Sequence, residues 1–169
     1  GEVPRGIVTI NGLATRGRRA GADLFARARQ EVPLDLLGLE ADQVEGGLGE
    51  INLFSLWQFA ARYRFYFHPV RYTSLGLSLC EAMMAGMPVI AFATTEAATV
   101  IENGVNGYSD TRIEPLIAHM QRLLADPAEA RRLGEGARRT ALARFNIERF
   151  VREWCDAFAL VTGIPYQAR

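Results

Sequence analysis

The sequence predicts an α/β fold in which helices cover a doubly wound parallel sheet. Short runs rich in β-branched and aromatic residues alternate with stretches whose apolar residues recur at helical spacing, which is the pattern of successive strand–helix–strand units. The last third of the chain is predicted to be almost entirely helical. With 169 residues, of which 49% are hydrophobic, the chain can bury one complete core, so we expect a single domain over residues 1–169.

The first 40 residues are predicted to form a strand–helix–strand unit. The β-branched run 6–10 predicts a buried strand, and a turn at Asn-Gly ends it. A helix is expected over 18–30, where apolar residues recur at helical spacing. Pro33 separates this helix from a second strand at 34–37.

The next segment predicts a loop, a weak strand and a helix. Residues 40–50 combine glycines with acidic side chains and are expected to form an exposed loop that leads to a weak strand near 51–54. Ser55 is the candidate cap of a helix that continues to residue 63. The aromatic run 64–68 predicts the next strand.

A handover from strand to helix follows. The loop after 64–68 leads to a helix expected over 76–85, and Gly-Met-Pro separates that helix from a strand at 89–93. In open parallel sheets ligands bind beside the carboxyl ends of the strands, so this loop is a candidate ligand site.

The end of the chain is predicted to be helical after one more turn. Residues 94–98 lead into a short helical piece, and the two glycines of 102–107 suit a turn with positive φ. Helices are expected over 114–125, 127–145 and 147–161, the second with its proline in the first turn.

Composition argues against several kinds of partner and site. The 19 basic residues balance the 19 acidic ones, so bulk charge gives no argument for a nucleic-acid partner or an anionic membrane. Cys80 and Cys155 have neither CxxC spacing nor histidine-rich company, which disfavours a disulfide framework or a zinc site and fits a reducing, cytoplasmic setting. No apolar run approaches the ~20 residues that span a bilayer, and the first residues lack the layout of a signal peptide.

The helix expected at 76–85 carries the first candidate binding residues. A helix that begins at Gly76 leaves the N–H groups of Leu77 and Ser78 unpaired at the positive end of its dipole, where a phosphate is stabilised. Gly76 also lacks the Cβ that would hinder close approach of a ligand. The alternative is that Gly76 serves only a tight turn.

Glu81 lies in the second turn of the same helix, among apolar residues. An unpaired carboxylate would be costly if it were buried there, so Glu81 needs a partner. Ribose hydroxyls can donate to it, as they do to an acidic residue in dinucleotide sites. The alternative is that Glu81 is paired with Arg71 or solvated.

Several stretches together resemble a known family. Gly76, the run EAMxxGxPVIA that starts at Glu81, the turn NGxxG at 103–107 and the helical ending are similar to the donor-binding, C-terminal half of retaining glycosyltransferases of family four, which have the GT-B fold. The resemblance covers essentially the whole chain. It implies that Glu81 binds the ribose of a nucleotide sugar, that the amides of Leu77 and Ser78 contact its diphosphate, and that no metal or other cofactor is needed. It also implies a missing N-terminal domain for the acceptor.

The chain departs from the family at the sugar end of the site. The family usually carries a second glutamate eight residues before Glu81, in contact with the donor sugar, and here that position is Thr73. Thr73 is therefore the candidate catalytic position, although its hydroxyl cannot supply the negative charge that stabilises a cationic sugar transition state. Thr95 and Glu96 likewise replace small glycines that the family often has at their place.

Basic residues follow the first strand, where the family usually places an arginine and a lysine against the donor phosphates. Arg16, Arg18 and Arg19 near a helix start would oppose its dipole, which is easier to understand if an anion binds there. We expect Arg18 and Arg19 to bind it, and the alternative is a solvated basic turn. His68, next to Pro69, is expected at the cleft edge, although a lone histidine is more often a structural residue.

The residues and the resemblance together predict a glycosyltransferase domain that binds a nucleotide diphospho-sugar, for transfer to a glycan, a lipid-linked or another acceptor, and the resemblance implies that the transfer occurs with retention. The isolated domain is expected to be inactive alone. A second hypothesis, motivated by Thr73, is a non-catalytic nucleotide-binding or interaction module of the same fold. A third, an unrelated doubly wound domain, lacks the GxGxxG motif after the first strand. Peripheral membrane association of a full-length protein stays open.

Overall fold

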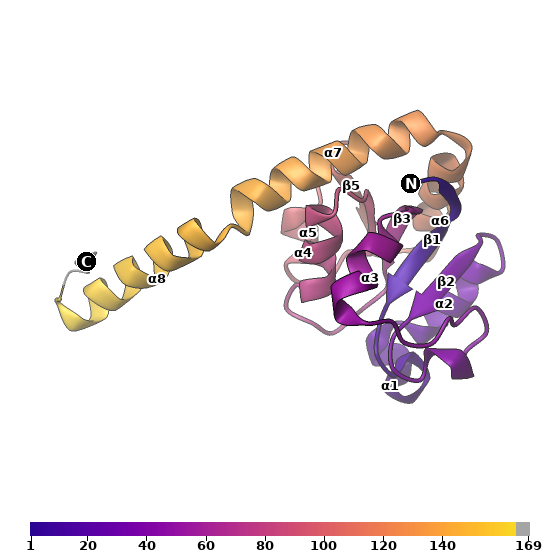
Figure 1. Ribbon diagram of the computed structural model, residues 1–169, viewed down its shortest axis with the longest axis horizontal. Coiled ribbons are helices and arrows are strands. Elements are labelled where there is room, and N and C mark those ends of the chain that lie inside the picture. Colours follow the sequence, from indigo (N-terminus) through magenta and orange to yellow (C-terminus); the bar gives the residue numbers. More distant parts are fainter. Residues whose placement is uncertain (165–169) are drawn as a thin grey trace.

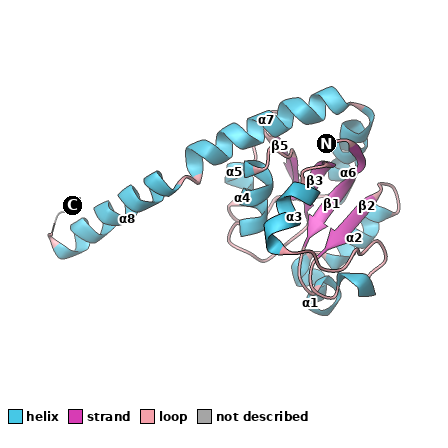
Figure 2. Cartoon of the chain, viewed as in Figure 1, coloured by secondary structure: helices cyan, strands magenta, loops and turns pink. Residues whose placement is uncertain are grey.

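The computed structural model describes residues 1–164 and contains a five-stranded parallel sheet of order β2-β1-β3-β4-β5. The predicted α/β fold with a doubly wound parallel sheet is confirmed (Figures 1 and 2). The strands are β1 (Val3–Thr9), β2 (Leu34–Leu37), β3 (Tyr63–His68), β4 (Val89–Phe92) and β5 (Gly107–Asp110). The helices are α1 (Leu13–Ala20), α2 (Ala22–Arg29), α3 (Leu53–Ala60), α4 (Leu77–Met84), α5 (Ala97–Val100), α6 (Ile113–Ala125), α7 (Pro127–Arg144) and α8 (Ile147–Thr162), with a 3₁₀ turn at Ala41–Gln43.

The order of the strands creates a switch point in the middle of the sheet. The chain moves outward from β1 to β2, and then returns to place β3 on the other side of β1 before it continues to β4 and β5. The connections after β1 and β3 therefore diverge to opposite sides. They leave a crevice at the carboxyl ends of these two strands, which is where open parallel sheets bind ligands.

Strand alternation divides the core into two layers. In β3 all six residues are buried, and successive side chains point to opposite faces. Phe65 and Phe67 belong to the core that includes residues of α2 and α6, whereas Tyr66 belongs to the core that includes residues of α4 and α7. A strand buried on both faces is rich in apolar and aromatic residues, and the aromatic residues 65–67 explain why the sequence predicted this strand well.

The helix predicted over 18–30 is in fact two helices. Gly21 separates α1 from α2 with a φ of 86°, in the left-handed region that favours glycine. A Cβ at this position would overlap the carbonyl oxygen of Pro69, so the break also lets the β3–α4 loop approach closely. The prediction was wrong because apolar periodicity runs through the break without marking it.

The weak strand predicted near 51–54 is also wrong. That segment contains the start of α3, and the side chain of Asn52, rather than Ser55, caps the helix by accepting from the N–H of Phe54 at 2.9 Å. An asparagine oxygen two residues ahead is well placed for this role. The short edge strand β5, which begins at Gly107, the last residue of the predicted turn, was not predicted.

The last two helices differ in their contact with the domain. Asp126 caps α7 by accepting from the N–H groups of Ala128 and Glu129, both at 3.0 Å, and the helix packs on α4. Asn146 caps α8 by accepting from the N–H of Arg149 at 2.8 Å. No residue of α8 is buried, and Figure 1 shows the helix projecting away from the sheet. Within residues 1–164 no helix has both the length and the apolar character that crossing a bilayer requires.

Candidate functional site

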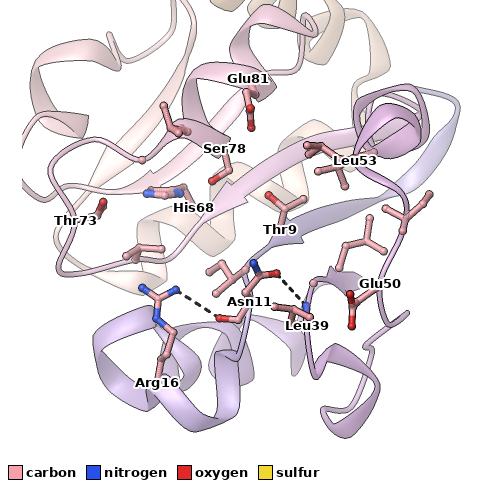
Figure 3. Close-up of a pocket in the computed structure, with 18 residues that line it drawn as sticks. Thr9, Asn11, Arg16, Leu39, Glu50, Leu53, His68, Thr73, Ser78 and Glu81 are labelled. Carbon is pink, nitrogen blue, oxygen red and sulfur yellow. Dashed lines mark hydrogen bonds between the residues drawn. The ribbon is translucent and has the colours of Figure 1, made fainter.

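A cleft of about 700 Å³ lies at the switch point of the sheet (Figure 3). Residues at the carboxyl ends of β1 and β2, the side chain of His68 at the end of β3, and the first turns of α3 and α4 line it. The sequence-predicted residues Thr73, Gly76, Leu77, Ser78 and Glu81 all lie in this lining. They come together because the loop that follows the carboxyl end of β3 leads directly into the first turns of α4.

The start of α4 offers free backbone donors to the cleft. Gly76 precedes the helix with a φ of 93°, and no side chain caps the first turn. Among residues 1–164, the N–H groups of Leu77 and Ser78 have no hydrogen-bond acceptor. Two free amides at the positive end of a helix dipole favour an anion such as phosphate.

A buried tyrosine supports the side chain of Ser78 from below. Tyr66 donates its hydroxyl hydrogen to Ser78 Oγ at 2.9 Å, and Thr9 Oγ1 lies 3.1 Å from the same tyrosine oxygen. Burial raises the pKa of Tyr66, so its hydroxyl stays protonated and remains a donor. Because Ser78 Oγ accepts from Tyr66, its own hydrogen is left for an acceptor in the cleft.

Glu81 is solvated at the cleft, and Arg71 is engaged elsewhere. The Arg71 guanidinium forms a two-pronged pair with Asp23, with N–O distances of 2.5 and 2.8 Å, and also donates to the carbonyl oxygen of Arg18. This pairing lowers the pKa of Asp23. Glu81 is exposed and, within the described part of the chain, forms no ion pair. Of the two alternative partners, solvent therefore remains, and the carboxylate oxygens are free to accept from a ligand.

His68 is the most unusual side chain of the cleft. It is only 2% exposed, and neither ring nitrogen has a hydrogen-bond partner among residues 1–164. Desolvation lowers the pKa of His68 from 6.5 to about 4, so the ring is neutral at physiological pH. A Cβ on Gly76 would lie 3.0 Å from Cε1 of the ring, so glycine makes room for the imidazole.

The basic residues after β1 are placed differently from expectation. Arg16 lines the cleft and donates to the carbonyl oxygen of Asn11 at 3.5 Å, with its guanidinium facing the α4 side in Figure 3. Arg18 and Arg19 are exposed in the last turn of α1 and do not belong to the lining. There they complement the negative end of the helix dipole, which explains the basic cluster without an anion. Their role in phosphate binding stays a prediction.

The cleft contains residues that the sequence did not single out. They are Thr9, Ile10 and Asn11 at the end of β1 and after it, Leu37, Gly38 and Leu39 at the end of β2 and after it, Glu50 and Ile51 before α3, Leu53 and Leu56 in α3, and Val70 after β3. Asn11 holds two of these segments together by accepting from the N–H of Leu39 at 2.9 Å. Its position directly after the first strand was the available signal, but Asn-Gly also predicts an ordinary turn.

Comparison with known proteins places this cleft in a family context. The family described as "Glycosyl transferases group 1" matches residues 44–140, which is more than half of the chain. A curated relative, the sucrose synthase of Denitrovibrio acetiphilus, is 26% identical over 122 residues, which are 67% of this chain and 16% of that protein.

Solved structures agree on the fold. Sucrose-phosphate synthase from Thermosynechococcus elongatus is similar with a TM-score of 0.77 and 23% identity, over 94% of this chain and 46% of that one. TarM of S. aureus gives 0.76 and 18%, over 94% and 36%. Anabaena HepE gives 0.75 and 19%, over 91% and 48%. The chain therefore spans less than half the length of these proteins.

Proposed function

The chain belongs to the group 1 glycosyltransferases, and from this premise we propose that it is the domain of such an enzyme that binds a nucleotide diphospho-sugar. One observation carries the proposal. The crevice at the switch point brings the free amides of Leu77 and Ser78 together with the solvated carboxylate of Glu81. These two features match the two ends of a nucleoside diphosphate, a ribose with hydroxyl donors and an anionic phosphate pair.

The spacing of these groups fits such a ligand. Glu81 lies one turn beyond Leu77, which is about 6 Å along the helix axis. In our proposal the ribose hydroxyls donate to Glu81, and the diphosphate accepts from the amides of Leu77 and Ser78 and from the Ser78 hydroxyl. The sugar extends toward Gly76 and Thr73. Arg16, on the opposite wall, is better placed than Arg18 or Arg19 to balance the phosphate charge.

Ligands of similar folds support the choice of ligand class. The structures of HepE include complexes with UDP and with UDP-glucose, and a TarM structure contains UDP. We propose a nucleotide diphospho-sugar of this kind as donor, with UDP as the first nucleotide to test. The cleft is also lined by the apolar side chains of Leu37, Leu39 and Leu53. We propose that a nucleobase packs against them, and because these side chains carry no charge, they would not select one base over another by charge.

The chemistry we propose follows from these contacts. As the glycosidic bond to the phosphate breaks, negative charge grows on the diphosphate, and amides fixed at the start of α4 stabilise that charge without reorganising. Retention of configuration, membership of family four, the position of this chain as the C-terminal half and metal-independent transfer are proposed on the resemblance. An N-terminal domain would bind the glycan, lipid-linked or other acceptor, so the isolated domain would not transfer sugar. We propose a cytoplasmic location for the enzyme.

A second candidate function is a nucleotide-binding module without turnover. Thr73 favours it, because a neutral hydroxyl stands where the resembling enzymes carry a carboxylate against the sugar. Both candidates share the nucleotide site. Transfer by a protein that contains both halves separates them: turnover of a donor that saturates the site supports the enzyme, and saturation without transfer to any acceptor in a broad screen supports the module.

Calorimetric titration with UDP, GDP and ADP tests the shared nucleotide site. At least one nucleotide should bind the wild-type chain, and Glu81→Ala should weaken it by about tenfold through the lost ribose hydrogen bonds. Glu135→Ala is the matched control, because Glu135 is an exposed glutamate of α7 that does not line the cleft. Absence of binding to all three nucleotides, or an affinity unchanged in Glu81→Ala, would reject the proposed site.

A further inference from the structure

The β3–α4 loop is a run of backbone donors without acceptors. Between Tyr72 and Ser78 no backbone N–H group has a hydrogen-bond acceptor among residues 1–164. Seven consecutive free amides can bind anions and hydroxyl groups together if they point to one side. Whether these amides can bind a ligand therefore depends on what orients the N–H groups that precede α4.

The β4–α5 loop forms hydrogen bonds with carbonyl groups of the β3–α4 loop. Thr95 Oγ1 donates to the carbonyl oxygen of Thr73 at 2.6 Å and also contacts that of Ser74. The N–H of Glu96 donates to the same Ser74 oxygen at 3.1 Å, and Thr94 Oγ1 donates to the carbonyl oxygen of Val70 at 3.1 Å. Three consecutive residues thus hold the loop from one side.

Because the peptide group is planar, the hydrogen bonds to these carbonyl groups also fix the direction of the N–H groups in the same peptides. In a trans peptide the C=O and the N–H point in opposite directions. The Thr73 carbonyl shares its peptide with the Ser74 N–H, and the Ser74 carbonyl shares its peptide with the Leu75 N–H. Because both carbonyls are turned toward Thr95, both N–H groups are turned away from it. Thr73 and Gly76, which flank Ser74 and Leu75 in the chain, line the cleft, and Thr95 does not.

The conformation of Thr95 argues that its hydroxyl is needed. Its φ is 46°, in the left-handed region that a β-branched residue avoids and glycine adopts freely. A glycine would relieve the strain and would lose the hydroxyl. Strained residues of this kind persist where their surroundings hold them, and they cluster at functional sites.

We infer that Thr95 is a positioning residue for the donor: it turns the amides of Ser74 and Leu75 toward the distal phosphate and the sugar. The inference rests on the proposed function and extends it to the part of the donor beyond the first phosphate. UMP, which ends at that phosphate, should not depend on Thr95, whereas UDP-glucose should.

Three substitutions at position 95 separate the hydroxyl from the backbone. Thr95→Val keeps the shape and removes the donor, Thr95→Ser keeps the donor, and Thr95→Gly removes both the donor and the strain. We expect the Val and Gly variants to bind UDP-glucose about tenfold more weakly and UMP within twofold of wild type, as fits the loss of oriented hydrogen bonds to a charged group. The Ser variant should bind both as wild type does.

Thr99→Val is the matched control, because the Thr99 hydroxyl donates only to Glu96 on the exposed side of the same segment. The thermal midpoint of each variant is measured alongside, and Thr95→Gly should be at least as stable as Thr95→Val. In ¹⁵N-labelled protein, the amide resonances of Ser74 and Leu75 should shift with UDP-glucose and not with UMP.

Two outcomes overturn the inference while the proposed function stands. One is a folded Thr95→Val variant that binds UDP-glucose like wild type, and the other is an equal loss of UMP and UDP-glucose. Failure of the wild-type chain to bind any of UMP, UDP and UDP-glucose, when GDP and ADP also fail, rejects the proposed function itself and the inference with it.

Discussion

The hydroxyl of Tyr66 lies 2.9 Å from Ser78 Oγ, so a fully buried core residue sets the direction of a cleft side chain. The tyrosine connects β3 to the first turn of α4 and also meets Thr9 at the end of β1. These three elements surround the switch point. The geometry of the cleft is therefore built into the packing of the sheet.

Removal of this hydroxyl should affect both stability and binding. Tyr66→Phe keeps the ring in the core but leaves Ser78 Oγ without its donor, and we expect a loss of about 1 kcal/mol in the free energy of unfolding. With its orientation relaxed, Ser78 should bind phosphate less well, and UDP affinity should fall by roughly two- to fivefold. Urea denaturation and calorimetry measure the two effects. Wild-type UDP affinity in a folded Tyr66→Phe variant would show that the serine needs no such support.

His68 should make stability depend on pH. The unfolded chain protonates this histidine near pH 6.5, whereas the folded chain does so only near pH 4. Between these values the unfolded state binds more protons, so stability falls as the pH is lowered, by up to about 1.4 kcal/mol per pH unit. Above pH 6.5 both states are neutral at this residue and the contribution is constant.

Replacement of His68 isolates this contribution from the carboxylates that titrate in the same range. His68→Phe and His68→Leu remove two unpartnered nitrogens, so the better packed of the two should be more stable than wild type at pH 7, by about 1 kcal/mol or more. The difference from wild type should grow between pH 6.5 and 4. Denaturation curves at pH 7, 6 and 5 provide the comparison, and a constant difference would contradict a depressed pKa.

Gly21 should be nearly irreplaceable. Gly21→Ala places a methyl group against the carbonyl oxygen of Pro69 in addition to forcing a left-handed alanine, and we expect a loss of about 3 kcal/mol or more. Gly104→Ala is the matched control, because its φ of 80° is similar and nothing lies within 4 Å of the new Cβ. That variant should lose only about 1 kcal/mol. Equal losses would mean that the α1–α2 break does not need the close approach.

The start of α3 can be checked in the same way. Asn52→Ala removes the oxygen that accepts from the N–H of Phe54 and should cost about 1 kcal/mol. Ser55→Ala, at the residue that the sequence suggested as the cap, should cost almost nothing, because Ser55 is the third residue inside the helix and Asn52 supplies the cap. Chemical denaturation of both variants decides between the two helix starts. The reverse order of losses would place the cap at Ser55.

The sequence predicted what depends on local pattern. The aromatic run 64–68 predicted β3, and the glycine, the helix start and the acidic residue of 76–81 predicted a candidate site whose members all line one cleft. The resemblance also pointed to a glycosyltransferase, and the group 1 glycosyltransferase family matches residues 44–140. These features are predictable because the strand, the loop and the helix that form them follow one another in the chain.

What depends on contacts between distant segments was not predictable. The α1–α2 break at Gly21 allows the loop that contains Pro69, some fifty residues later, to pass close to the backbone. The hydrogen bond from Thr95 to the Thr73 carbonyl joins two loops that are separate in the sequence. Arg16 rather than Arg18 or Arg19 lines the cleft, and Gly17, whose φ of 53° interrupts the helix, lies between Arg16 and the other two. The pattern of residues along the chain does not show which distant segments come into contact.

The contrast between β3 and the loop after it has a consequence for hydrogen exchange. Every residue of β3 is buried between two paired neighbours, so its amides should exchange only when the whole domain unfolds. The amides of 72–78, which follow four residues later, have no acceptor in the described chain and should exchange within the dead time of a manual experiment. The amide hydrogens of residues 72–78 should thus exchange rapidly, although they closely follow the strand whose amides are expected to be the most protected. A bound ligand that engages those amides would appear as slow exchange against an unchanged background.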